Sequence, residues 1–105
     1  MNEGPKQALV AATDASLRVG AFDLLASYGF RVDATGDARA LGRRLEKDRY
    51  DWLITDAEEL PPLPASTAIV QITRETLPDR SAWTAQIETR LREAGLSPLE
   101  SSEES

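Results

Sequence analysis

The groups of this chain that could carry out chemistry are carboxylates and hydroxyls that follow apolar runs. Asp56 comes directly after the run WLIT, Asp14 follows the run ALVAAT, and Thr73 closes the run TAIVQIT. A carboxylate at the end of a hydrophobic strand is well placed for phosphate chemistry or for binding a metal ion through its oxygens. Asp56 is therefore the first candidate for a phosphate or metal site.

Composition removes several other kinds of site. The 105 residues include no cysteine and no histidine, which excludes disulfides, thiol nucleophiles, Ser-His-Asp catalysis and the usual zinc sites. The formal net charge of −6 argues against nucleic acid or an anionic membrane as the main partner. No apolar run approaches the ~20 residues of a membrane span and no signal-peptide pattern occurs, so we expect a cytoplasmic location without direct membrane contact.

Four short apolar or alternating runs predict β-strands at 8–13, 30–35, 51–55 and 67–73. Three further segments carry apolar residues at helical spacing. Side chains that can cap a helix precede each of them, namely Asp14 or Ser16, Asp37, and Asp79 or Ser81. Glycines that can end a helix follow the first and the last, namely Gly29 and Gly95. The three prolines between residues 60 and 64 exclude a regular helix there.

This order of elements predicts an α/β fold. We expect a shortened, doubly wound parallel sheet of four strands in the order 2-1-3-4, with helices on both faces and the loop 60–64 in place of a third helix. The last helix should share a face with the first and bury Trp83 with Ile87 and Leu91. The stretch SAWTAQI offers an alternative, because its weak alternation also fits a fifth strand.

One small domain accounts for most of the chain. Residues 8–96 contain all the predicted elements and form this domain. Residues 1–7 are interpreted as an N-terminal linker, and the polar, acidic segment 97–105 as a flexible tail or linker. Because sites in such sheets form at the C-terminal ends of strands, we expect Asp14, Asp56 and Thr73 at one edge of this domain.

The stretch 8–73 resembles a response-regulator receiver domain of the flavodoxin-like class. The resemblance rests on LVAATDASLRVGAFDLLASYGFRV, with Arg18 and Gly29 at the family's spacing, and on GDARALGRRLEKDRYDWLITD. It implies that Asp56 occupies the position of the phosphoacceptor aspartate. It also implies that Thr73 occupies the position of the hydroxyl that contacts the phosphoryl group.

Two departures from the family pattern change this expectation. The family binds Mg²⁺ with an acidic pair at the end of the first strand, where this chain has Ala12 and Thr13. The family's lysine follows a fifth strand, whereas only the six residues Arg74 to Asp79 separate the fourth strand from the last helix. We therefore expect no bound metal and no cofactor, and interpret Asp56 as an inherited carboxylate that accepts backbone N–H groups. Asp14 is interpreted as a helix cap rather than a metal ligand.

The resemblance then implies a pseudo-receiver: a regulatory domain without catalysis in a two-component phosphorelay protein, such as a hybrid histidine kinase. The parent protein could be anchored in the inner membrane. Its partners would be the kinase core or a true receiver domain, met through protein–protein contacts. The candidate contacts are Arg18, Glu58, Glu59, Leu60 and Leu63. The two leucines could form an apolar contact patch or cover the sheet where a helix is absent.

Two other functions stay open at the level of sequence. The first is a receiver that is phosphorylated on Asp56, which convergence of Asp14 and Asp56 on one cavity with room for a metal would favour. The second is a sensor of a nucleotide messenger, which a concave arginine cluster beside an aromatic ring would favour. The arginines concerned are Arg39, Arg43, Arg44 and Arg49. The acidic residues Asp37, Glu46 and Asp48 lie among them and favour a solvated, self-paired face.

Overall fold

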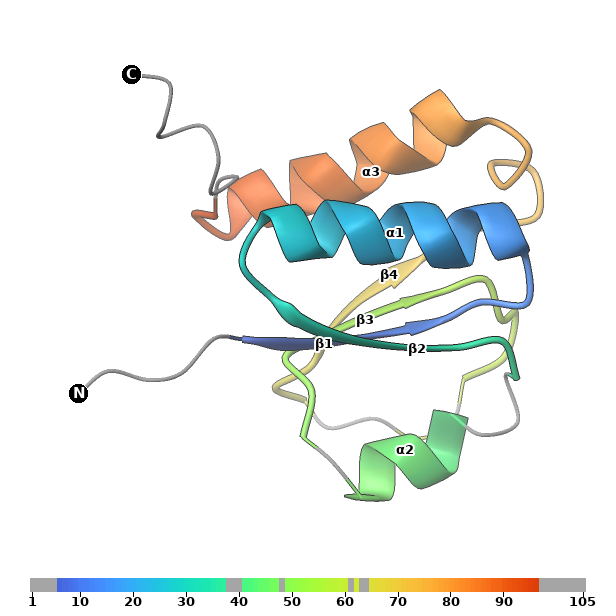
Figure 1. Cartoon of the computed structure of the whole chain (residues 1–105). Coiled ribbons are helices and arrows are strands. Elements are labelled where there is room, and N and C mark those ends of the chain that lie inside the picture. The colour runs from blue at the N-terminus through green and yellow to red at the C-terminus, as the bar shows by residue number, and fades with distance from the viewer. Residues whose placement is uncertain (1–5, 38–40, 48, 61, 63–64, 97–105) are drawn as a thin grey trace.

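The computed structural model describes residues 6–37, 41–47, 49–60, 62 and 65–96. It is an α/β fold built on one sheet of four parallel strands in the order β2-β1-β3-β4 (Figure 1), which confirms the predicted class and strand order. The elements are β1 (Gln7–Ala11), α1 (Ala15–Ser27), β2 (Arg31–Thr35), α2 (Leu41–Lys47), β3 (Trp52–Thr55), β4 (Ala68–Gln71) and α3 (Arg80–Glu93).

The sheet separates two apolar layers. Helices α1 and α3 cover one face and α2 covers the other (Figure 1), so the prediction that the last helix shares a face with the first is confirmed. Alternate residues of β1 divide between the layers, as the pleat of a strand requires: Val10 packs under α1 and α3, whereas Leu9 packs toward α2. Strand β3 is buried along its whole length, which explains its continuous apolar run.

Aspartate caps and glycine stops set the ends of the two long helices. Asp14 caps α1, since its carboxylate accepts the Leu17 N–H at 3.0 Å, and Asp79 caps α3. Gly29 and Gly95 follow the two helices with φ angles of 88° and 86°, a left-handed conformation that favours glycine. The fifth-strand alternative is wrong, because SAWTAQI lies inside α3. The cap predicted at Asp37 cannot be placed, because residues 38–40 lie outside the described part of the chain.

Helix α3 packs closely on α1 and buries its apolar stripe. Trp83, Ile87 and Leu91 are each at most 1 % exposed, as predicted. The two helices approach closely at Gly20 of α1, where an added Cβ atom would lie only 2.6 Å from Cη2 of Trp83. The Arg80 guanidinium sits 5.6 Å from the centre of the same ring. The missing side chain at Gly20 therefore lets the indole reach the helix surface.

The outer edge of β4 is sealed by α3 instead of by a fifth strand. The backbone groups of Ile69 and Gln71 face away from β3 in this parallel ladder. The Arg90 guanidinium donates to the Ile69 carbonyl at 2.9 Å, and the Gln86 amide donates to the Gln71 carbonyl at 3.3 Å. We call Gln86 and Arg90 the edge caps, because they donate to the two outward carbonyls of β4 that another strand would otherwise bond.

Candidate functional site

The C-terminal edge of the sheet brings Asp14 and Asp56 together, as predicted. Asp56 follows β3, and Asp14 ends the short loop between β1 and α1. Their contact is made by the Asp14 backbone, whose N–H donates to Oδ2 of Asp56 at 3.1 Å. Thr73 lies farther along the same edge, in the turn between β4 and α3.

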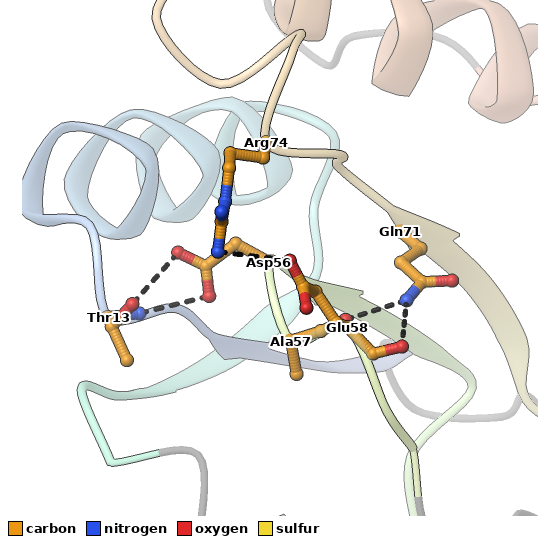
Figure 2. Close-up of polar contacts among 6 residues, drawn as sticks. All are labelled: Thr13, Asp56, Ala57, Glu58, Gln71 and Arg74. Atoms are coloured by element: carbon orange, nitrogen blue, oxygen red, sulfur yellow. Dashed lines mark hydrogen bonds and ion pairs between the residues drawn. The ribbon is translucent and has the colours of Figure 1, made fainter.

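Three donors from the β1–α1 loop occupy the carboxylate of Asp56, two of them from Thr13 (Figure 2). Besides the Asp14 N–H, the Thr13 N–H donates to Oδ1 at 3.1 Å, and the Thr13 hydroxyl donates to Oδ2 at 3.2 Å. Both carboxylate oxygens are thus engaged by this loop. The arrangement joins the end of β3 to the end of β1, and the carboxylate accepts backbone N–H groups, as expected from the sequence.

The other two candidates have local hydrogen-bonding roles. The Asp14 carboxylate caps α1 at Leu17. The Thr73 hydroxyl lies 3.1 Å from the Thr76 hydroxyl and accepts the Thr76 N–H at 3.4 Å, which closes the turn before α3. In the part of the chain that the structure describes, no group of three or more acidic, histidine or cysteine side chains could hold a metal ion.

A polar cluster beside Asp56 was not predicted from the sequence. Arg74, from the loop after β4, forms a salt bridge with Glu58, whose carboxylate oxygen lies 3.2 Å from the guanidinium (Figure 2). The Gln71 amide fixes the chain beneath them, donating to the carbonyls of Ala57 at 2.6 Å and Glu58 at 3.2 Å. Arg74 and Glu58 border an open hollow of about 500 Å³. The pair itself is strongly exposed, and such pairs contribute little to stability.

The predicted partner contacts divide into exposed and internal residues. Glu58 and Glu59 are exposed. Arg18 is half-buried, and its guanidinium donates to the Ala12 carbonyl at 2.9 Å, so it helps to hold the end of β1. Leu60 is half-buried against the apolar layer under α2, so it covers the sheet rather than forming an exposed patch. Leu63 lies outside the described residues.

Two of the arginines considered for a nucleotide site are described by specific surroundings: one forms an ion pair and the other borders a hollow. Arg44 lies 3.8 Å from the carboxylate of Asp33, a residue of β2 rather than of its own helix. Arg49 lines a hollow of about 320 Å³ next to Tyr50. That ring is buried, and its hydroxyl donates to Asp33 at 2.6 Å, so it offers no open face for a base to stack on. Arg39 and Asp48 lie outside the described residues.

Comparisons of the chain with models of known protein families, with curated proteins and with solved structures gave no match. The receiver resemblance therefore depends on the residues quoted above. Among the described helices, none is long and apolar enough to cross a membrane.

Proposed function

We propose that this chain is a pseudo-receiver: a regulatory domain without catalytic activity that acts through protein–protein contacts in a two-component phosphorelay protein. The observation that carries this proposal is the state of Asp56. Its carboxylate accepts three hydrogen bonds from Thr13 and Asp14, at the place where the family has a metal-binding acidic pair. In this proposal the domain works in the cytoplasm, within a parent protein that can be anchored in the inner membrane.

The requirements of phosphoryl transfer support the proposal that this domain does not carry it out. Transfer to a carboxylate needs cations that neutralise the charge of the phosphoryl oxygens, and a receiver uses Mg²⁺ and a lysine for this purpose. Here Asp14 is engaged as a helix cap, and α3 follows β4 after a turn that carries an arginine but no lysine. That arginine, Arg74, pairs with Glu58.

The proposed partner surface is the part of the C-terminal edge that carries Glu58, Glu59 and Arg74. The three side chains are exposed, and the hollow beside them gives the surface relief. Two glutamates and a chain charge of −6 suit a partner with a basic face. A surface of this size binds weakly by itself, so we expect it to depend on tethering to a kinase core or receiver domain in the same assembly.

A nuclear magnetic resonance titration of the uniformly ¹⁵N-labelled domain tests the loss of chemistry. Mg²⁺, followed by beryllofluoride or acetyl phosphate, should leave the amide signals of Thr13, Asp14 and Ala57 unshifted. Asp56→Asn is the matched control, since any specific adduct must disappear in this variant. A saturable shift in the wild type that Asp56→Asn abolishes would establish the phosphoacceptor function instead.

A second titration, with the kinase core or the true receiver of the parent protein, tests the contact surface. The expected shifts fall on Glu58, Glu59 and Arg74 and weaken as salt is added. Glu59→Lys should reduce binding, whereas Glu93→Lys, an exposed change at the far end of α3, should not. Shifts confined to the hollow around Arg49 would contradict this surface and favour an anionic ligand there.

A further inference from the structure

The two edges of the sheet differ in how their outward backbone groups are hydrogen-bonded. The β4 edge is sealed by the edge caps, but the β2 edge is open. The backbones of Arg31 and Thr35 bond toward β1, at 2.8 Å and 3.0 Å, so those of Val32 and Ala34 face outward. These outward groups have no protein partner among the described residues. The strand has no proline and no bulge, and its charged residues are Arg31 and Asp33.

Helix α1 carries an apolar stripe beside that open edge. Ala15, Val19, Phe22 and Ala26 follow one another at spacings of four, three and four residues, and all four are exposed. Val19 and Phe22 are 59 % and 38 % exposed, and both border a hollow that Ala34 of β2 also lines. This spacing is that of a seam between two packed helices. The sheet-facing side of α1 is already buried. Phe22, which borders the hollow beside Ala34, lies on the flank of the helix nearer to β2.

The charges of β2 complement one another in an antiparallel pairing. If two copies of the strand pair around Val32, Arg31 of each copy stands opposite Asp33 of the other. A shift of the centre by one residue would place the two Asp33 carboxylates opposite each other, which is unfavourable. Arg31 is exposed and has no partner among the described residues, while Asp33 keeps half of its side chain in solvent.

We propose that the domain forms a symmetric dimer with a second copy of itself, in which the two β2 strands pair antiparallel around Val32. The result is a continuous sheet of eight strands, four from each copy. Strands in a sheet lie about 4.8 Å apart, and α1 lies over β1 and β2, so the two α1 helices would run side by side at roughly 10 Å. That separation is normal for packed helices and brings Phe22 of one copy against the small Ala26 of the other.

A second copy fits this surface better than an unrelated strand, because every element of the surface is self-complementary. A two-fold axis at Val32 pairs the outward backbone groups and the Arg31–Asp33 charges at the same time, and it brings the flanks of the two α1 helices together near Phe22. The C-terminal edge with Glu58, Glu59 and Arg74 lies away from this axis and stays accessible. The dimer is therefore independent of the proposed regulatory contact, so failure of one proposal would not contradict the other.

Disulfide trapping tests the geometry, because the wild-type chain contains no cysteine. Residues that exchange backbone bonds in an antiparallel pair have Cα atoms about 5.5 Å apart, within the range of a disulfide. Val32→Cys should give a covalent dimer on mild oxidation. Ile69→Cys, on the capped β4 edge, is the matched control and should give no covalent dimer under the same conditions. A Val32→Cys variant that is folded by circular dichroism and does not cross-link overturns the proposal.

Sedimentation equilibrium tests the interface in the native chain. The wild type should approach twice the mass of the 11.5 kDa monomer as its concentration rises. Phe22→Glu should weaken the dimer about thirtyfold or more, the effect of losing a central aromatic contact, whereas Ser81→Glu on exposed α3 should not. A wild type that stays monomeric, or a dimer unaffected by Phe22→Glu, overturns the proposal.

Charge exchange provides an independent test. Arg31→Asp alone and Asp33→Arg alone each place like charges opposite one another in a homodimer, so each should be monomeric. Mixing the two variants restores opposite charges at both positions and should restore a mixed dimer. Asp33→Arg also removes the acceptor of the Tyr50 hydroxyl, so circular dichroism is needed to establish whether this variant is folded. If the mixture stays monomeric although both variants are folded, the proposed register is wrong.

Discussion

The Asp56 carboxylate and the Thr13 residue are joined twice, through the Thr13 N–H at 3.1 Å and the Thr13 hydroxyl at 3.2 Å. This contact connects the ends of two neighbouring strands, β3 and β1. The threonine brings two neutral donors to the aspartate, so the contact connects the two strand ends.

A structural role for Asp56 predicts a loss of stability on its removal. Asp56→Ala leaves the N–H groups of Thr13 and Asp14 without their acceptor and should lower the free energy of unfolding by about 1–3 kcal/mol. Thr13→Val removes only the hydroxyl bond and should cost less. Urea denaturation of the three proteins measures the order. Equal stability of Asp56→Ala and the wild type would show that the carboxylate does not support the fold.

The sequence predicted the sheet well because its signals are local. The apolar run of β3, the aspartate caps and the two glycine stops each act within a few residues, and four strands in this chain order leave few possible topologies. It did not predict the edge caps. The contact of Arg90 with the Ile69 carbonyl joins residues far apart in the chain, and nothing in a single arginine on a helix distinguishes an edge cap from a solvated charge.

Some features of the candidate site could also be predicted from the sequence, and others could not. That Asp14 and Asp56 share an edge follows from the rule for parallel sheets, and the cap role of Asp14 follows from its position before α1. The Arg74–Glu58 pair depends on how the turn after β4 folds back over β3, which composition does not specify. Leu60 was as compatible with an exposed patch as with a cover, and the space left by the missing helix decided between them.

Replacement of glycine by alanine should have opposite effects at Gly20, where α1 packs against α3, and at Gly42, which lies in α2. Gly20→Ala places a methyl group against the Trp83 ring and should destabilise the domain by about 1–3 kcal/mol through overpacking. Gly42→Ala in α2 meets no atom within 4 Å and should stabilise it by about 0.5–1 kcal/mol through the reduced entropy of the unfolded chain. Thermal unfolding compares the two. A Gly20→Ala variant as stable as the wild type would mean that the helices can move apart at little cost.

Tyr28 predicts an alkaline limit to stability. Burial raises the pKa of Tyr28 above its ordinary value of 10.0; the Glu88 carboxylate adds to the shift, and Arg92 opposes it. The folded state therefore favours the neutral phenol, so this contribution is complete below about pH 10 and is lost as pH rises through the raised pKa. Tyr28→Phe should reduce the loss of stability above that pH.

The same variant is informative at neutral pH. The Tyr28 hydroxyl is buried and makes no hydrogen bond of ordinary geometry among the described residues, although the Arg92 side chain lies near enough to lower its pKa. Its removal should therefore leave the free energy of unfolding at pH 7 unchanged or slightly raised. Urea denaturation at pH 7 and above pH 10 measures both effects. A clear loss of stability at pH 7 would reveal a hydrogen bond that the hydroxyl makes in solution.

The edge caps predict how the domain protects the β4 edge of its four-stranded sheet. Arg90→Met keeps the aliphatic stem but withdraws the donor from the Ile69 carbonyl, and Gln86→Ala withdraws the donor from Gln71. Each substitution should lower the free energy of unfolding by about 1 kcal/mol, and the double variant should expose unpaired backbone groups along β4.

We expect the double variant to form assemblies larger than a dimer as concentration rises, since its sheet then has two open edges. Glu93→Ala, exposed near the end of the same helix, should change neither quantity. Urea denaturation and sedimentation velocity measure the two effects, and a double variant that matches the wild type in both would show that the β4 edge needs no cap.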